Sequence, residues 1–186
     1  MNEMKQKIKD IALQYFSSKG YYGTSIRDIS RDAECSLPTV YYYFKNKENL
    51  FEELAYKDFI ALNERLQGEV TVNENIKDMY LQSILKRLNL KGNDRLVYIL
   101  AQKTILGLEG SSETKLKLTK WEKERFGFAH YLLQKYYNIS EPVYGNILSR
   151  VSSNILQKGL LTNDLITNEE VKKEIDLLFE LFLQKK

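Results

Sequence analysis

Hydroxyl-bearing side chains crowd one short stretch, LPTVYYYFKNK, which spans residues 37–47. It holds Thr39 and the consecutive tyrosines Tyr41, Tyr42 and Tyr43. Hydroxyl groups donate hydrogen bonds to phosphate oxygens, and aromatic rings contact sugars and the methyl group of thymine. These residue types therefore suit the backbone and groove of a nucleic acid, provided that the fold exposes them.

The spacing of apolar residues decides which of these rings can be exposed. In a helix each residue is turned by about 100° from the last, so three consecutive tyrosines cannot share one face. Leu37, Val40 and Phe44 have helical spacing and form the predicted buried stripe. Tyr42 and Tyr43 then lie outside that stripe. The alternative is that both rings pack against neighbouring helices and bind nothing.

The elements that must position these residues are helices. The 186 residues include only two prolines and nine glycines, and apolar residues recur with helical spacing almost throughout. The sequence therefore predicts an all-α fold, in which Gly20 ends the first helix. The expected helices span residues 2–18, 25–34, 36–44, 47–67, 75–90, 94–109, 113–137, 141–158 and 169–184.

The helices over residues 25–34 and 36–44 are too short to persist alone, because nucleation consumes most of what their few hydrogen bonds return. Ser25 and Ser36 are their predicted N-caps, and Pro38 fits the first turn of the second helix. A short turn joins the pair, and the longer first helix supports it. This is the layout of a helix-turn-helix, whose second helix is presented to DNA.

The charge distribution agrees with a nucleic-acid-binding module at the N-terminus. The net charge is only +3, but the first 47 residues carry eight bases against five acids. The remaining residues carry 20 bases and 20 acids. The positive excess therefore lies in the first quarter of the chain, as expected for a small DNA-binding module joined to a neutral domain.

The sequence shows no sign of secretion or membrane insertion. The N-terminal residues MNEMKQKIKD are charged where a secretory signal would be apolar. No apolar run approaches the roughly 18 residues of a membrane span. The single cysteine, Cys35, excludes an intramolecular disulfide and is expected to pack in the turn rather than to sense redox state. We therefore expect a soluble, cytoplasmic protein.

Catalytic and metal-binding constellations do not emerge from the sequence. The only histidine, His130, and the only cysteine cannot supply the usual ligands of zinc. The glycines of LGLEGSSETK lack the spacing of a phosphate-binding loop. A hydrolase built on His130 would need a serine or a carboxylate within hydrogen-bond reach. We therefore expect no enzyme activity, no metal and no cofactor.

The segment GYYGTSIRDISRDAECSLPTVYYYFKNKENLFEEL resembles the DNA-binding segment of TetR-type transcriptional repressors. That pattern has a glycine, a second helix capped by threonine or serine, a short turn and then Tyr-x-x-Phe. Beyond the start of the fourth helix, the chain agrees with the family in length and helical character. The resemblance implies a DNA-binding domain over residues 1–46 and an effector-binding and dimerisation domain over residues 47–186, with helix 47–67 as the connector.

The resemblance also implies roles in DNA binding. Ser25 would cap the second helix and meet a phosphate, and Lys47 would reach another phosphate. Arg27 is similar to a position that reads bases, where an arginine can bind guanine O6 and N7, and a phosphate contact is the alternative. The other residues expected at the DNA surface are Leu37, Pro38, Thr39, Tyr41, Tyr42 and Tyr43.

The chain departs from the family pattern in the turn. Glu34 stands where glycine is usual, and Cys35 stands where valine is usual. A left-handed backbone costs more for glutamate than for glycine, so the turn is where the expected geometry is least secure. Leu37 occupies a place that is often polar, which leaves fewer side chains to read bases and more of the specificity to DNA shape.

The last two helices carry more apolar residues than one face can bury, which implies a second partner. By resemblance this partner is a second copy of the chain, and a twofold dimer would present two recognition helices to successive major grooves of a palindromic site. The alternative is a thick monomer core. The residues predicted at the dimer interface are Ile147, Val151, Ile155, Val171, Ile175, Leu178 and Phe182.

The resemblance further implies a pocket for a small-molecule effector among the middle helices. Each aromatic residue there can equally belong to the core. The alternative is a regulator of the same fold that answers to a protein partner, without a small-molecule effector. The candidate pocket residues are Tyr98, Trp121, Phe126, Phe128, His130 and Tyr131.

Overall fold

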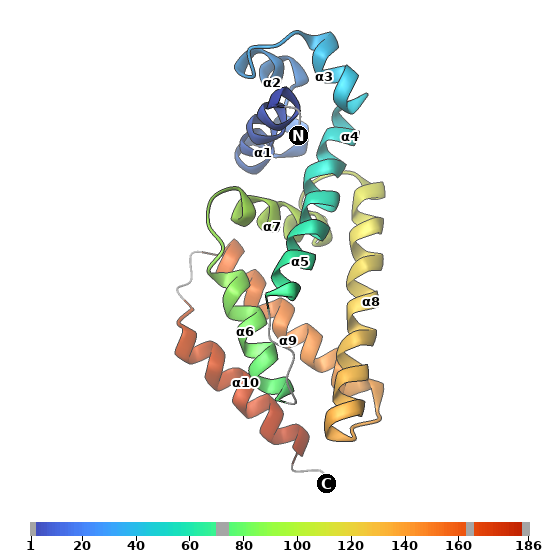
Figure 1. The fold of residues 1–186 in the computed structure, drawn as a ribbon, viewed down its shortest axis with the longest axis vertical. Coiled ribbons are helices and arrows are strands. Elements are labelled where there is room, and N and C mark those ends of the chain that lie inside the picture. Colours follow the sequence, from blue (N-terminus) through green and yellow to red (C-terminus); the bar gives the residue numbers. More distant parts are fainter. Residues whose placement is uncertain (1–2, 70–74, 163–165, 184–186) are drawn as a thin grey trace. The chain divides into compact units, whose positions relative to one another are not determined.

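The computed structural model describes residues 3–69, 75–162 and 166–183. Every regular element among these residues is a helix, which confirms the all-α prediction (Figure 1). No helix in this part of the chain is both long enough and apolar enough to cross a membrane. The described residues form two compact units: unit 1 lies within Met1–Asn63 and Lys91–Thr119, and unit 2 lies within Glu64–Leu90 and Lys120–Lys186.

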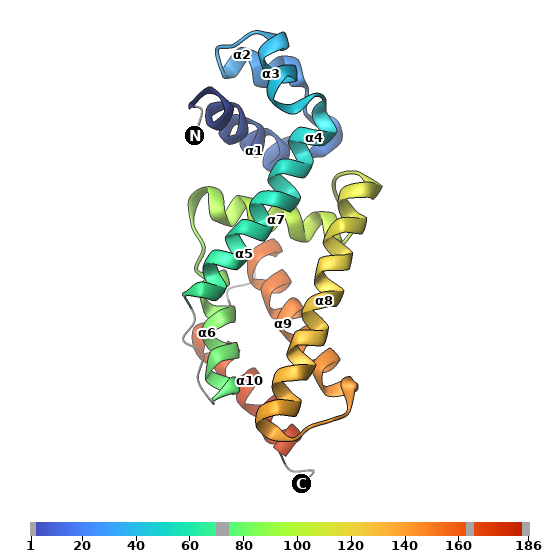
Figure 2. The same ribbon diagram turned by 45° about the vertical axis from the view of Figure 1, so that its right-hand side comes forward.

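Unit 1 contains the predicted helix-turn-helix. Its first helix contacts the two short helices that follow and also α7, which passes below α1 in Figure 2. The connector is an unbroken helical run in which the π-helical turn η1 separates α4 from α5. The elements that begin in unit 1 are α1 (Glu3–Gly23), α2 (Ile26–Asp32), α3 (Leu37–Phe44), α4 (Lys47–Glu52), η1 (Glu53–Asp58), α5 (Phe59–Gly68), α7 (Gly92–Ile105) and α8 (Ser112–Tyr137).

The end of α1 differs from the prediction. Gly20 has a φ of 72°, which kinks the helix, but α1 then resumes as far as Gly23. The backbone angle favours glycine here, and a Cβ atom at Gly20 would lie 2.7 Å from Oε1 of Glu109 and displace the end of that side chain. The kink leaves one further turn, which carries Tyr21 and Tyr22 to the start of α2.

Unit 2 is built on α6, which contacts both α9 and α10. Lys77 of α6 pairs with Asp176 of α10 at 2.7 Å. The start of α10 is fixed by a capping box, in which Thr167 Oγ1 accepts from the Glu170 N–H at 3.2 Å and Glu170 Oε2 accepts from the Thr167 N–H at 2.8 Å. The helices that begin in unit 2 are α6 (Ile76–Leu88), α9 (Pro142–Leu161) and α10 (Asn168–Leu183).

Candidate nucleic-acid interface

Hydrogen-bonded caps fix the starts of the two short helices. The Ser25 hydroxyl accepts from the N–H of Arg27 at 3.2 Å, and the Ser36 hydroxyl accepts from the N–H of Thr39 at 3.3 Å. Both predicted N-caps are therefore confirmed. Because each cap satisfies a backbone donor that the helix leaves free, the sequence determines locally where α2 and α3 begin.

The turn between α2 and α3 contains both residues that depart from the family pattern, Glu34 and Cys35. Glu34 has a φ of 56°, in the left-handed region that favours glycine. Its N–H donates to the carbonyl of Arg31 at 3.0 Å, and the N–H of Cys35 donates to the carbonyl of Ser30 at 3.0 Å. Lys7 of α1 donates to the Glu34 carboxylate at 2.6 Å and lowers the pKa of that carboxyl group. Glu34 therefore adopts a left-handed backbone although it is not glycine, and Lys7 of α1 binds its side chain.

The outer face of α3 presents hydroxylated rings to solvent. Tyr42 is 81% exposed and Tyr41 is 47% exposed, whereas Val40 and Phe44 are buried. The sequence predicts an exposed Tyr43, but this residue is half-buried, because its ring packs between those of Tyr42 and Phe44 at 5.1 and 6.3 Å. The aromatic surface of α3 is thus formed by Tyr41 and Tyr42, with Tyr43 behind them.

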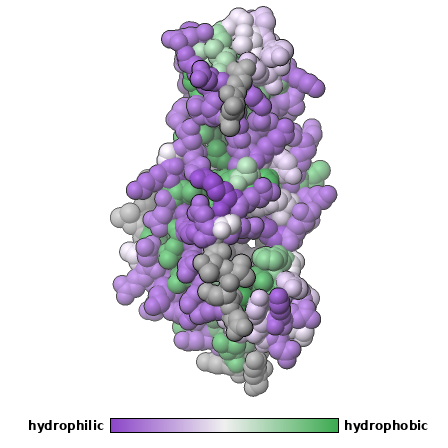
Figure 3. Space-filling model, in the orientation of Figure 1, coloured by the Kyte–Doolittle hydropathy of each residue, from purple (hydrophilic) through white to green (hydrophobic). Residues whose placement is uncertain are grey.

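No carboxylate interrupts this face, since α3 consists of the residues LPTVYYYF. The surface above α3 is accordingly pale in Figure 3, between hydrophilic and hydrophobic. Pro38 is exposed, and Thr39 is half-buried. Leu37 is also half-buried, so the buried stripe of α3 consists of Val40 and Phe44 rather than of all three predicted residues. The Thr39 hydroxyl lies 2.8 Å from the hydroxyl of Ser36, so the first turn of α3 is held in place by its own cap.

The two arginines of α2 differ in their surroundings. Arg31 pairs with Asp28 at 2.9 Å and with Asp32 at 3.0 Å, which offsets its charge within the helix. Arg27 is exposed on the same helix. Of these two side chains, Arg27 is therefore the one that can offer its guanidinium group to an external anion or base edge.

The side chain of Lys47 is hydrogen-bonded within unit 1. Its ammonium group donates to the carbonyl oxygens of Tyr21 at 3.0 Å and Thr24 at 3.2 Å. The same nitrogen lies 4.4 Å from the centre of the Tyr21 ring. Because an ammonium group has three N–H donors, a phosphate contact by Lys47 would have to use the donor that these two carbonyls leave. In this structure Lys47 caps the end of α1.

The sequence of residues 8–54 matches the family described as bacterial regulatory proteins of the tetR family. This range begins in α1 and contains α2, the turn and α3 in full. Residues 8–54 belong to the tetR family. The matched description is of regulatory proteins rather than enzymes, and the matched residues include every predicted DNA contact of this chain.

The curated relatives that match this chain include a negative transcriptional regulator. The biofilm operon icaADBC negative transcriptional regulator IcaR of Staphylococcus aureus is 38% identical over 85 residues, which are 46% of this chain and 44% of IcaR. The chain thus spans less than half the length of the curated relatives it matches.

Solved structures share the fold over nearly the whole chain. A TetR-like transcriptional regulator from Rhodococcus sp. RHA1 has a TM-score of 0.76 at 16% identity and covers 100% of this chain and 98% of its own. The multidrug binding protein EbrR, complexed with malachite green, has a TM-score of 0.73 at 18% identity and covers 95% of this chain and 98% of its own. At these identities the likeness concerns the fold alone.

The aromatic residues predicted to line a tetR-type ligand pocket have different surroundings. Tyr98 is 1% exposed in the core of unit 1, with its ring 5.2 Å from that of Phe59. Phe128 and Tyr131 of α8 are 55% and 52% exposed. Their rings stack at 6.4 Å. Tyr98 is therefore a packed core residue, whereas Phe128 and Tyr131 form an aromatic pair on the surface of α8.

The other predicted pocket residues also lie on α8. Trp121 is half-buried, with the guanidinium carbon of Arg125 4.9 Å from the ring centre. The Nδ1 atom of His130 is buried, and the described residues supply no hydrogen-bond partner for it. The side chain of Phe126 lies outside the described residues.

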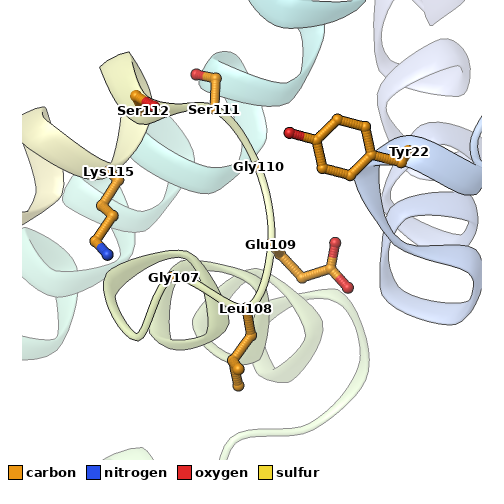
Figure 4. A pocket seen from close by; sticks show the side chains of 8 residues that line it. All are labelled: Tyr22, Gly107, Leu108, Glu109, Gly110, Ser111, Ser112 and Lys115. Carbon is orange, nitrogen blue, oxygen red and sulfur yellow. The ribbon is translucent and has the colours of Figure 1, made fainter.

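A pocket of about 260 Å³ occurs elsewhere, in unit 1. Figure 4 shows it between the Tyr22 ring, the loop after α7 and Lys115 of α8. The loop side chain of Glu109 points towards Tyr22, and its carboxylate accepts from the N–H of Tyr21 at 2.8 Å. None of the residues lining this pocket is among those predicted from the sequence.

The predicted dimer residues are mostly covered by the chain itself. The α10 stripe faces the interior of unit 2 because α6 and α9 pack on it. On α9, Ile155 is 2% exposed, Val151 is half-buried and Ile147 is 37% exposed. The buried α10 residues, with their exposed fractions, are Val171 (0%), Ile175 (0%), Leu178 (9%) and Phe182 (5%).

The apolar surface open to a partner therefore differs from the predicted set. Leu177 and Leu181 of α10 are 51% and 62% exposed, and Val143 of α9 is 54% exposed. With Ile147, we name these residues the α9–α10 apolar face. The sequence signal for the α10 part is the i, i+4 spacing of Leu177 and Leu181 outside the buried stripe.

Proposed function

We propose that this chain is a transcriptional repressor that binds double-stranded operator DNA through α2 and α3. The observation that carries the proposal is the exposed face of α3, which bears Tyr41 and Tyr42 and no carboxylate. Arg27 is exposed on the preceding helix. The description of IcaR as a negative regulator supports repression rather than activation.

The geometry supports a distinct role for each side chain. In the major groove, the hydroxyls of Tyr41 and Tyr42 donate to phosphates while their rings contact sugars or thymine methyl groups. Arg27 binds either guanine O6 and N7 or a phosphate. The Ser25 oxygen accepts from the helix backbone, which leaves its own O–H able to donate to an external acceptor such as a phosphate.

The test of DNA binding is selection of bound duplexes from a random pool at a stated salt concentration. Tyr42→Ala is expected to weaken binding to all sequences by roughly tenfold, because it removes one hydrogen bond to a charged group. If Arg27 reads guanine, Arg27→Ala is expected to relax the sequence preference at one base pair. If Arg27 contacts a phosphate, the variant is expected to bind all sequences more weakly.

The matched control for this selection is Tyr131→Ala, which removes an exposed tyrosine of α8 and should leave affinity unchanged. If the wild-type protein selects no sequence, or if Tyr42→Ala binds as tightly as the wild type, the proposed role of α3 is overturned.

The repressor acts as a homodimer that places two α3 helices in successive major grooves of a palindromic operator, roughly 34 Å apart. Its support is the α9–α10 apolar face, because a second copy of the chain that covers these four exposed side chains would remove them from water. In Figure 3 hydrophobic surface interrupts the mostly hydrophilic covering near the lower end, where α10 lies.

Charged substitution of this face tests the dimer. The double variant Leu177→Lys, Leu181→Lys is expected to raise the dissociation constant of the dimer by at least about 100-fold, because each protomer loses two buried leucines and gains two desolvated charges. Sedimentation velocity measures this change. The control Leu116→Lys alters a leucine of α8 that is 70% exposed and should leave the dimer intact. An unchanged dimer in the double variant would place the interface elsewhere.

The effector is a small molecule that binds the helical domain and releases the operator through its differential affinity for two states. The complex of EbrR with malachite green supports this choice. A protein partner is the second candidate, and the exposed Phe128–Tyr131 pair favours it. A small molecule that changes the fluorescence of Trp121 and also releases the operator would exclude the second candidate.

A further inference from the structure

The Glu48 carboxylate of unit 1 accepts hydrogen bonds from hydroxyl groups of α1 and of the start of α8. Glu48, the second residue of α4, accepts from the Tyr21 hydroxyl at 2.8 Å through Oε2. Through Oε1 it accepts from the Thr114 hydroxyl at 2.9 Å and from the Ser111 hydroxyl. Thr114 is fully buried, and the other three residues are half-buried. We name these four residues the Glu48 cluster.

The charge of Glu48 lies near two helix N-termini. Glu48 belongs to the first turn of α4, and Ser111 caps α8 by accepting from the N–H of Thr114 at 3.2 Å. Free backbone N–H groups at both sites favour a negative charge. Burial, followed by the bond to Glu48, raises the pKa of Tyr21 to about 12, so its phenol keeps the donated proton at neutral pH.

Tyr21 is also fixed through its backbone. Its N–H donates to Glu109 Oε2 at 2.8 Å, and its carbonyl accepts from Lys47 Nζ at 3.0 Å. The chain leaves this point at Tyr21 and returns to it at Lys47 and Glu48. The segment between them, residues 22–46, contains α2, the turn and α3. Both ends of the segment that carries the helix-turn-helix are therefore held by one set of hydrogen bonds.

We propose that Glu48 is a positioning residue for DNA recognition, which holds both ends of the helix-turn-helix against the first turn of α8 without contacting DNA. This inference rests on the proposed function. Removing a donor from the Glu48 cluster leaves the face of α3 chemically unchanged but frees the ends that orient it. Affinity should then fall because the rings and Arg27 no longer meet their DNA partners together.

The test uses single substitutions in the full chain, two that delete a donor hydroxyl and one that neutralises the carboxylate. Tyr21→Phe, Thr114→Val and Glu48→Gln are each expected to weaken binding to the wild-type-selected sequence by about 2- to 30-fold. The dependence of log K on log salt should keep its slope, because no phosphate contact is lost. In the Glu48→Gln background, Tyr21→Phe and Thr114→Val should have little further effect. The controls Tyr22→Phe and Thr119→Val remove neighbouring hydroxyls outside the cluster and should bind as the wild type.

Hydrogen exchange without DNA provides a second measurement. In Thr114→Val, the amides of α2 and α3 should exchange faster, while those of α6 and α10 stay unchanged. If the cluster variants bind DNA as the wild type does, or if faster exchange is confined to residues 109–114, the positioning role is overturned. A wild-type protein that binds no DNA overturns the proposed function instead, and the exchange result still decides whether Glu48 orients the helix-turn-helix.

Discussion

The Phe51→Ala variant is expected to lose about 3–5 kcal/mol of the free energy of unfolding. Phe51 is fully buried, and its ring packs edge-on against Phe16 at 5.1 Å and Tyr21 at 5.0 Å. The loop after α7 also lies against this ring, because a Cβ atom at Gly110 would overlap it. The variant would leave a cavity lined by α1, α4 and this loop. This cavity cannot collapse without moving all three, so the protein should lose the full contribution of the ring to the free energy of unfolding.

Urea denaturation followed by circular dichroism measures this loss. Phe51→Leu keeps most of the buried volume and should cost less than about 1.5 kcal/mol. Leu116→Ala, at a residue that is 70% exposed, should change the free energy of unfolding by no more than about 0.5 kcal/mol. A loss below 1 kcal/mol for Phe51→Ala would contradict the role of this ring as the junction of unit 1.

Gly145→Ala is expected to destabilise unit 2 by about 2–3 kcal/mol through overpacking. A Cβ atom at Gly145 of α9 would lie 2.8 Å from the backbone nitrogen and Cα of His130 and 2.7 Å from its Cβ. Backbone atoms cannot rotate away as a long side chain can, so α8 and α9 would have to separate. Their separation would also loosen the packing of neighbouring side chains in unit 2.

The matched control is Gly127→Ala on α8, where a Cβ atom meets nothing within 4 Å. This variant should stabilise the protein by up to about 1 kcal/mol, because alanine loses less conformational entropy in a helix. Thermal melting of the two variants should therefore shift in opposite directions. Equal shifts would show that α8 and α9 can accommodate a methyl group at Gly145.

Local features of this fold are readable from the sequence. The caps Ser25 and Ser36 and the stripe of Val40 and Phe44 depend on residues within a few positions of each other, and the structure has them where the sequence predicts. The all-α fold follows from the same short-range spacing. The exposure of Tyr42, on which the DNA-binding proposal depends, is also a consequence of helical period alone.

Features that depend on residues far apart in the sequence cannot be predicted from local sequence patterns. Glu48 and Thr114 are 66 positions apart, and Lys7 reaches Glu34 across 27 positions. Nothing in the local pattern pairs them. The buried stripe of α10 illustrates a second limit: periodicity identifies an apolar face, but only the packing of α6 shows that this face is used within the chain.

The π-helical turn η1 has a consequence for the length of the connector. Leu54 and Phe59 are both buried although they are five positions apart, because a π-helical turn accommodates one more residue than an α-helical turn. Deleting one residue inside Glu53–Asp58 would convert this turn into a uniform α-helix, in which residues four positions apart share a face, so Phe59 would still face Tyr98. The same deletion in a purely α-helical part of the connector would rotate every later side chain by about 100°. η1 is therefore the place where the connector can lose one residue and keep the helical segments on either side in rotational register.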